Sequence, residues 1–149
     1  DLNMKAYYFA SRSAARYMKQ QENRGVIVCI SSTNSERYTT RRSPYNISKA
    51  AVNGMVGTLA VEWGRFGIRI NAVAPGFVMT DMLKKGIAEG IIDVDNNMKV
   101  IPMKRLITTE EIGNAVCFLA SDEASGVTGQ TLFVDGGWSR AGLPEEKDI

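Results

Sequence analysis

The chain contains no histidine among its 149 residues. A histidine-based catalytic triad and a histidine-ligated metal site are therefore excluded within this chain. Cysteine is almost as scarce: Cys29 and Cys117 are the only two, and each lies in an apolar stretch. We expect both to be buried, reduced core thiols rather than a disulfide or a metal site. Any chemistry in this chain must therefore use other side chains.

Long apolar runs and a strong charge imbalance are also missing. No run approaches the roughly 18 apolar residues that span a bilayer, and no signal peptide opens the chain. The 18 basic and 16 acidic residues leave a formal charge of +2, which gives no reason to invoke nucleic acid or an anionic membrane. We expect a cytoplasmic enzyme with a small-molecule substrate, no metal, no nucleic acid and no membrane partner.

Helical and strand-like patterns alternate along the sequence. Apolar residues recur at helical spacing over residues 4–20, with Asn3 in the position of an N-cap. The continuous apolar run 26–30 predicts a strand buried on both faces, and a polar loop follows over residues 31–43. The remaining expected elements are a helix at 45–65, a strand at 68–73, a broken-helical flap at 77–105, a helix at 112–120 and a strand at 131–135.

This alternation predicts an α/β fold with a parallel sheet. A doubly wound Rossmann-like sheet normally has two βαβαβ halves, and three strands make only one. The chain starts at Asp1 without a methionine and has no Gly-x-Gly-x-x-Gly phosphate loop. We therefore expect residues 1–149 to be the C-terminal catalytic part of one dinucleotide-binding domain. On this hypothesis the N-terminal half belongs to a longer protein, and the 149 residues alone are inactive.

Tyr45 and Lys49 form the candidate reactive pair. They are four residues apart on one expected helix, so their side chains share a face, although this spacing alone is close to chance. The pair follows a buried strand and a polar loop, which places it at the carboxyl edge of the sheet, where open α/β sheets bind ligands. Ser31 and Ser32 end that strand and bring hydroxyl groups to the same edge.

Taken together, these segments resemble the short-chain dehydrogenase/reductase family. Ser32, the thirteen-residue step to Tyr45 and the run from Tyr45 to Lys49 are similar to its catalytic signature. Residues 71–80 and 129–137 resemble two further family segments, and residues 1–3 are similar to the segment that bears a structural asparagine. The resemblance covers nearly the whole chain, in the right order and spacing.

The resemblance implies four catalytic residues. Tyr45 would be the general acid/base at the substrate oxygen, and Ser32 would orient that oxygen towards it. A free tyrosine ionises near pH ~10, so Lys49 and an oxidised nicotinamide would supply the positive charge that favours the phenolate. Lys49 would also bind the nicotinamide ribose. Asn3 would hold a water that links Lys49 to solvent, although an N-cap role explains Asn3 equally well.

The resemblance also implies the cofactor, NAD or NADP. Tyr45 and Lys49 would contact it, together with a segment after the second strand that contains Pro75, Gly76, Val78 and Thr80. Gly76 would allow close backbone approach, Val78 would pair its backbone with the carboxamide, and Thr80 would reach carboxamide or phosphate.

Three functions stay open at this point. The polar loop 34–43 favours an oxidoreductase for a sugar, polyol or other small polar substrate. A 3-oxoacyl-carrier-protein reductase is the alternative, with Arg37, Arg41 and Arg42 facing an acidic carrier. A catalytically silent binding or assembly fragment is the alternative of another class. The resemblance also implies a homo-oligomer, a dimer or a homotetramer, packed through the helices 4–20 and 45–65.

Overall fold

A three-stranded parallel sheet forms the centre of the computed structural model, which describes residues 2–22 and 25–141. The strands are β1 (Val26–Ile30), β2 (Arg69–Pro75) and β3 (Thr131–Val134), in the order β1-β2-β3. Cys29 pairs with Ala72 in the first ladder, and Ala72 pairs with Thr131 in the second. The expected α/β fold with a parallel sheet is confirmed.

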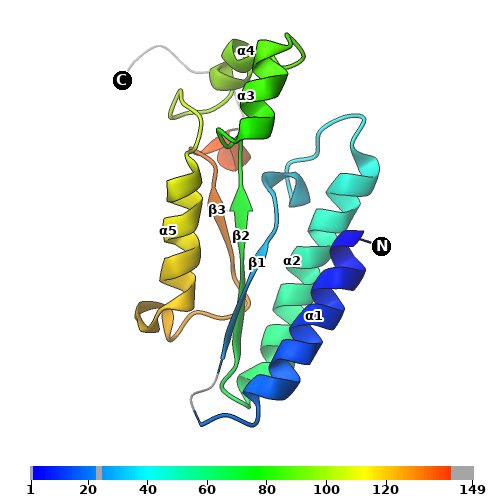
Figure 1. Ribbon diagram of the computed structural model, residues 1–149, viewed down its shortest axis with the longest axis vertical. Helices are drawn as coiled ribbons and strands as arrows, with labels where there is room; N and C mark the ends of the chain where they lie inside the picture. Colours follow the sequence, from blue (N-terminus) through cyan, green and yellow to red (C-terminus); the bar gives the residue numbers. More distant parts are fainter. Residues whose placement is uncertain (1, 23–24, 142–149) are drawn as a thin grey trace.

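Helices cover both faces of this sheet (Figure 1). α1 (Leu2–Met18) and α2 (Ser43–Gly64) lie on one face, and α5 (Thr109–Ala120) lies on the other. The expected flap consists of α3 (Asp81–Ala88) and α4 (Val94–Lys99), which lie beyond the carboxyl ends of the strands. Short 3-10 turns occupy Thr33–Ser35, Asp122–Ala124 and Trp138–Arg140. No helix in the described residues is both long and apolar enough to cross a bilayer.

α2 is the central helix of the larger core cluster. Pro44 lies in its first turn, where a missing N–H costs no helical hydrogen bond. Val52, Val56 and Leu59 follow at helical spacing and are almost completely buried against Ile70 and Ala72 of β2. Burying each such side chain contributes about 1.5–3 kcal/mol, so this face fixes α2, and with it Tyr45 and Lys49, against the sheet.

Two side chains of β2 anchor the opposite face. Arg69 donates from its guanidinium to the carbonyls of Leu119 (2.8 Å) and Ser121 (2.9 Å), which lie at the C-terminus of α5. Asn71 is fully buried; it donates to the carbonyl of Val127 and accepts from the N–H of Gln130. These bonds satisfy buried backbone groups that the sheet and helix leave unpaired.

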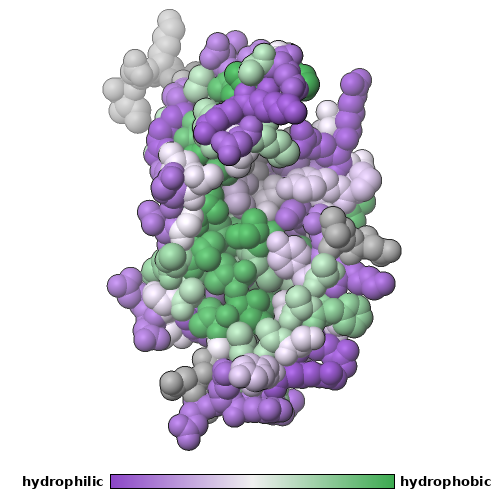
Figure 2. All heavy atoms as spheres, viewed as in Figure 1, coloured by the Kyte–Doolittle hydropathy of each residue, from purple (hydrophilic) through white to green (hydrophobic). Residues whose placement is uncertain are grey.

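β1 is not buried on both faces as expected. Cys29 is buried, whereas Val26, Ile27 and Val28 are half-buried and Ile30 is 37% exposed. The reason is that β1 pairs only with β2 in the described part of the chain, which leaves its other edge open. Figure 2 shows apolar side chains gathered on this side of the molecule, between α5 and α1.

Two further expectations are wrong. Cys117 is exposed rather than buried, because α5 packs on the sheet through Ala115 and Leu119, and Cys117 lies between them on the outer face of the helix. Asn3 is not an N-cap: α1 already begins at Leu2, so Asn3 lies inside its first turn. The side chain of Asn3 is therefore available for a contact with another element.

Candidate active site

A cleft of about 350 Å³ lies at the carboxyl ends of β1 and β2. The structure brings nearly all of the predicted site residues to it. Those lining the cleft are Ser32, Tyr45, Lys49, Pro75, Gly76, Val78 and Thr80. Its other walls are Ile30 and Ser31 at the end of β1, and Thr109 and Ile112 in the first turn of α5. Of the residues predicted for the site, only Asn3 lies outside this lining.

Tyr45 and Lys49 occupy successive turns of α2. Tyr45 is 39% exposed, whereas Lys49 is only 7% exposed. The Nζ of Lys49 lies 5.7 Å from the ring centroid of Tyr45 and donates a 2.8 Å hydrogen bond to the carbonyl of Ile30. The predicted pair is therefore an open hydroxyl-bearing ring beside a buried cation.

No carboxylate of the described residues neutralises the charge of Lys49. Burial lowers the pKa of the Lys49 amine from its ordinary value, and the neighbouring Cys29 thiol opposes that change. No acidic side chain lies within ion-pair distance of Lys49 among residues 2–22 and 25–141. An ammonium group has three protons to donate, and the bond to Ile30 uses one. The remaining protons can bind hydroxyl groups in the cleft.

A network of buried side chains fixes Ser32 relative to α2. The Oγ of Ser32 accepts a 3.2 Å bond from the N–H of Asn34. The side-chain amide of Asn34 then donates to Asn46 Oδ1 (2.9 Å) and to Thr39 Oγ1 (2.7 Å). Because Asn46 follows Tyr45 directly, the polar loop and the reactive helix are held as one unit. Asn34 and Asn46 have no sequence signal of their own, since only their burial distinguishes them from solvated loop residues.

Asn3 reaches α2 but contacts Ser48 rather than Lys49. Its Nδ2 donates to the Oγ of Ser48 at 2.9 Å, and that hydroxyl donates to the carbonyl of Tyr45 at 2.8 Å. The two residues of this contact are 45 positions apart in the sequence. The bond links the start of α1 to the turn of α2 that carries the reactive pair. The proposed water relay through Asn3 stays a prediction.

Gly76 is required by protein packing. A Cβ at this position would lie 2.7 Å from the Cβ and 2.8 Å from the Cα of Asp135. Asp135 is itself buried and accepts bonds from the N–H groups of Gly137 (2.9 Å) and Ser139 (2.7 Å), which shape the turn after β3. The close approach expected at Gly76 is thus present, but its partner is the chain after β3.

Val78 and Thr80 present backbone and hydroxyl groups to the cleft. Val78 and Ile107 form an isolated β-bridge. Its two hydrogen bonds run from the N–H of Met79 to the carbonyl of Ile107 and from the N–H of Ile107 to the carbonyl of Phe77, so they flank Val78. This leaves the N–H of Val78 without a hydrogen-bond partner in the described part of the chain. Thr80 accepts from the N–H of Leu83 and caps α3, which leaves its hydroxyl proton to donate. The donor set suits an amide with both donor and acceptor atoms.

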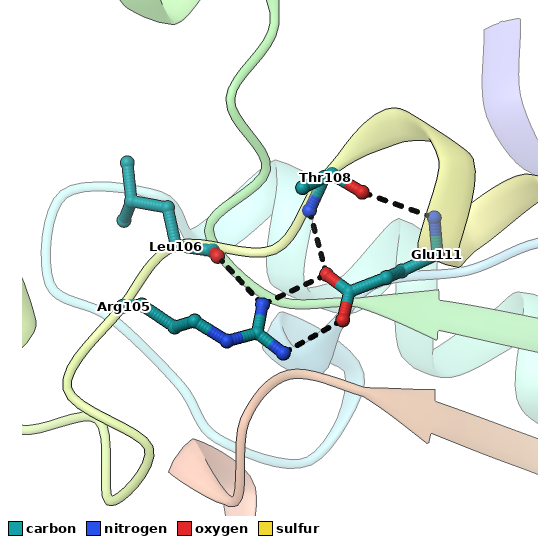
Figure 3. A network of polar contacts seen from close by, with 4 residues as sticks. All are labelled: Arg105, Leu106, Thr108 and Glu111. Atoms are coloured by element: carbon teal, nitrogen blue, oxygen red, sulfur yellow. Dashed lines mark hydrogen bonds and ion pairs between the residues drawn. The ribbon is translucent and has the colours of Figure 1, made fainter.

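The start of α5 borders the cleft through a capped and charged turn (Figure 3). Thr108 and Glu111 form a capping box, and Arg105 donates to both carboxylate oxygens of Glu111 at 2.7 and 2.9 Å. The hydrogen bond from Arg105, followed by the Thr108 N–H, lowers the pKa of Glu111 to about 2. This network holds Thr109 and Ile112 in the cleft wall.

A second cavity of about 560 Å³ adjoins Ser32 and Tyr45 and extends beneath the flap. Trp138 and Phe77, with ring centroids 4.7 Å apart, form one wall. The flap helices α3 and α4 line another part of it. Its polar lining residues are Thr33, Asn34, Thr39, Arg42, Thr80, Asp93, Asn96 and Asn97. The flap itself is expected from the sequence, but its individual contacts are not, because the flap has no regular apolar period.

No group of three or more cysteine, aspartate or glutamate side chains able to hold a metal ion occurs in the described residues. The hydrogen-bond donors that line the cleft suit a nicotinamide cofactor. The free protons of Lys49 suit ribose hydroxyls, and the N–H of Val78 suits a carboxamide oxygen. These residues could hold the nicotinamide end of such a cofactor.

Known proteins resemble the chain over most of its length. A family model described as enoyl-(acyl carrier protein) reductase matches residues 1–139. A 3alpha-hydroxysteroid dehydrogenase of Mediterraneibacter gnavus is 45% identical over 136 residues, which are 91% of this chain and 53% of that relative. A 3-oxoacyl-(acyl-carrier-protein) reductase of Rickettsia felis is 40% identical over 92% of this chain and 55% of its own. The chain spans about half the length of these relatives.

Solved structures agree in fold. The aldohexose dehydrogenase of Thermoplasma acidophilum superposes with a TM-score of 0.84 at 34% identity, over 95% of this chain and 58% of its own. A structure of ElxO with NADP bound gives a TM-score of 0.83 at 36% identity, over 88% of this chain and 52% of its own. The chain belongs to the short-chain dehydrogenase/reductase family.

Proposed function

We propose that this chain carries the catalytic centre of an oxidoreductase that interconverts a carbonyl and a secondary alcohol with NAD or NADP. The observation that carries the proposal is the single cleft that Ser32, Tyr45 and Lys49 share with the Pro75–Thr80 segment. Each of these groups has a separate task in such a reaction, and none of the tasks requires a histidine or a metal.

Tyr45 moves the proton. In the reducing direction its hydroxyl gives a proton to the substrate oxygen, and in the oxidising direction it takes that proton back. The buried ammonium of Lys49, 5.7 Å from the ring centroid of Tyr45, places a positive charge beside that ring, and no carboxylate of the described residues pairs with it. Ser32 donates a hydrogen bond to the same substrate oxygen and orients it. The nicotinamide, when bound, supplies the hydride chemistry.

Lys49, Val78 and Thr80 hold the nicotinamide end of the cofactor on this proposal. The ammonium of Lys49 binds ribose hydroxyls, the N–H of Val78 binds the carboxamide, and the hydroxyl of Thr80 donates to carboxamide or phosphate. The pyrophosphate and the adenosine bind residues outside these 149, since the printed sequence contains no glycine-rich phosphate loop. On this proposal, those residues determine the preference for NAD or NADP.

The substrate is a small polar alcohol or carbonyl compound, such as a sugar or polyol. The cavity beneath the flap supports this class, because amide, hydroxyl and charged groups line it beside the Trp138–Phe77 wall. Hydroxyl groups of a sugar match amide side chains, while the indole face covers the apolar side of the ring. The similarity to an aldohexose dehydrogenase is consistent with this choice.

The substrate experiment uses the natural protein that contains this chain. Cofactor binding is measured first by titration with NAD and NADP, and turnover is then followed by nicotinamide absorbance with a panel of polyols, aldoses and 3-oxoacyl thioesters. Turnover of a polyol or aldose supports the proposal. Turnover of 3-oxoacyl thioesters alone would replace it with the reductase alternative, which the 40% identical Rickettsia felis relative favours. Binding of neither nucleotide would favour a silent assembly protein.

We also expect the natural protein to be a cytoplasmic dimer or tetramer. α1 and α2 lie side by side on one face, and α1 exposes Tyr8, Phe9 and Tyr17. A second copy would cover such side chains. Light scattering would test this expectation: a mass equal to one chain of the natural protein would contradict it.

A further inference from the structure

Tyr7 of α1 also lies beside the reactive lysine. The Nζ of Lys49 lies 5.7 Å from the ring centroid of Tyr7, the same distance as from the ring of Tyr45. The two rings come from different helices, so α1 and α2 each bring one ring to the ammonium. Both distances are within the range in which the face of an aromatic ring attracts a cation.

The hydroxyl of Tyr7 also shares an acceptor with Lys49. It donates to the carbonyl of Ile30 at 3.1 Å, and Lys49 donates to the same oxygen at 2.8 Å. The carbonyl at the end of β1 therefore fixes the ring of Tyr7 beside the amine. Tyr7 also packs against the core cluster of α2 and the sheet, which holds the ring from behind.

The hydroxyl of Tyr7 keeps its proton and does not serve as a second base. Burial, followed by smaller effects of Cys29 and Tyr45, raises the pKa of Tyr7, against the opposing bond to Ile30. Burial likewise raises the pKa of Cys29, so the thiol stays protonated at neutral pH. In the described residues the titratable groups facing Lys49 are thus Tyr7 on α1, Cys29 on β1 and Tyr45 on α2.

The geometry points to Tyr7 as a positioning residue that shields the ammonium of Lys49 from water and directs its field to Tyr45. This inference rests on the proposed function for its kinetic consequence, but not for its structural one. A charge acts more strongly through a protein environment than through water, so removing the ring of Tyr7 weakens the effect of Lys49 on Tyr45 without removing either residue.

The kinetic test is the pH profile of alcohol oxidation by the natural protein. Tyr7→Ala moves the acid limb to higher pH by about one unit, which is roughly a tenfold loss on that limb, and the high-pH plateau is kept. Tyr7→Phe retains the ring, so its pH profile stays close to that of the wild type. Tyr38→Ala is the control, because Tyr38 is 70% exposed on the loop before α2 and lines neither cavity.

Loss of rate by the same factor at every pH would overturn the inference, since that is the signature of a merely structural role. An equal shift in Tyr38→Ala would overturn it as well. If Tyr7→Ala does not fold, Tyr7→Leu fills much of the same space without an aromatic ring. The acid limb then moves in the same direction but by a smaller amount.

A second readout does not depend on activity. Titration of the lysine ε-carbon signals by NMR, with Lys49 assigned by the signal lost in Lys49→Arg, follows the amine directly. In Tyr7→Ala the pKa of Lys49 moves up towards its ordinary value as water reaches it. An unchanged Lys49 titration would overturn the inference. If the wild-type protein oxidises no alcohol, the proposed function fails, and this titration still decides the role of Tyr7.

Discussion

Lys49 and Arg105 are two cations near the same cleft, and their surroundings differ in almost every respect. Lys49 is buried, has no carboxylate partner in the described residues and lies near two aromatic rings. Arg105 is exposed and is bound through two hydrogen bonds to Glu111. The paired charge of Arg105 stabilises the start of a helix. The buried charge of Lys49 has no counter-ion in the described residues, so its electric field acts on the neighbouring groups.

The two settings also shift the titrations in opposite senses. Burial lowers the pKa of Lys49, while the hydrogen bond and charge of Glu111 raise the pKa of Arg105. Lys49 is thus held at a cost to folding, and such costs gather at functional sites. Arg105 contributes to local structure at no such cost.

The two cations should differ most in their effect on activity. Lys49→Met lowers kcat of the natural protein roughly 10²-fold, because the variant loses the charge that the proposed mechanism places beside Tyr45 and assigns to ribose binding. Arg105→Met, the matched control, changes kcat by about twofold or less, since exposed ion pairs contribute little. Steady-state kinetics measure both. Comparable losses in the two variants would abolish the distinction.

Thr108→Ala tests the structural role of the capped turn. We expect it to lower the free energy of unfolding by about 1 kcal/mol, because the N–H of Glu111 loses its acceptor at the start of α5. Urea denaturation measures the change, with the exposed loop residue Thr40→Ala as control. An unfolding free energy equal to that of the control variant would show that the cap does not stabilise α5.

The smallest expected effect is the pH dependence of the Arg105–Glu111 pair. The pKa of Glu111 is depressed from 4.5 to about 2, so its stabilising effect is complete above about pH 4.5 and is lost as pH falls towards 2. The difference in Tm between wild type and Glu111→Gln should therefore shrink through that window. Glu36→Gln, which alters an exposed loop residue, is the control; a difference independent of pH would contradict the assignment.

Much of the fold could be predicted from local sequence pattern. The β-branched run 26–30, Pro44 at a helix start and the apolar period of α2 each depend on residues close in the chain. The same holds for Tyr45 and Lys49, whose four-residue spacing fixes a shared helix face. These features needed no knowledge of tertiary contacts.

The rest depended on contacts distant in sequence. Tyr7 meets Ile30 across 23 residues and Asn3 meets Ser48 across 45, and neither spacing has a recognisable pattern. The contact of Gly76 with Asp135, at the end of another strand, has no recognisable pattern either, and the cofactor approach expected at Gly76 stays a prediction. The exposure of β1 was missed because an apolar run reveals what a strand can bury, not which neighbours are present.

The most direct test of the central claim is the rate of Tyr45→Phe in the natural protein, followed by nicotinamide absorbance with the best substrate found. The variant keeps the ring beside Lys49 and removes only the hydroxyl. We predict a loss of about 10²–10⁴-fold in kcat with cofactor binding retained, while Tyr38→Phe, at an exposed tyrosine of the preceding loop, stays near the wild-type rate. A Tyr45→Phe variant as fast as wild type would contradict the assignment of Tyr45 as the proton donor and acceptor.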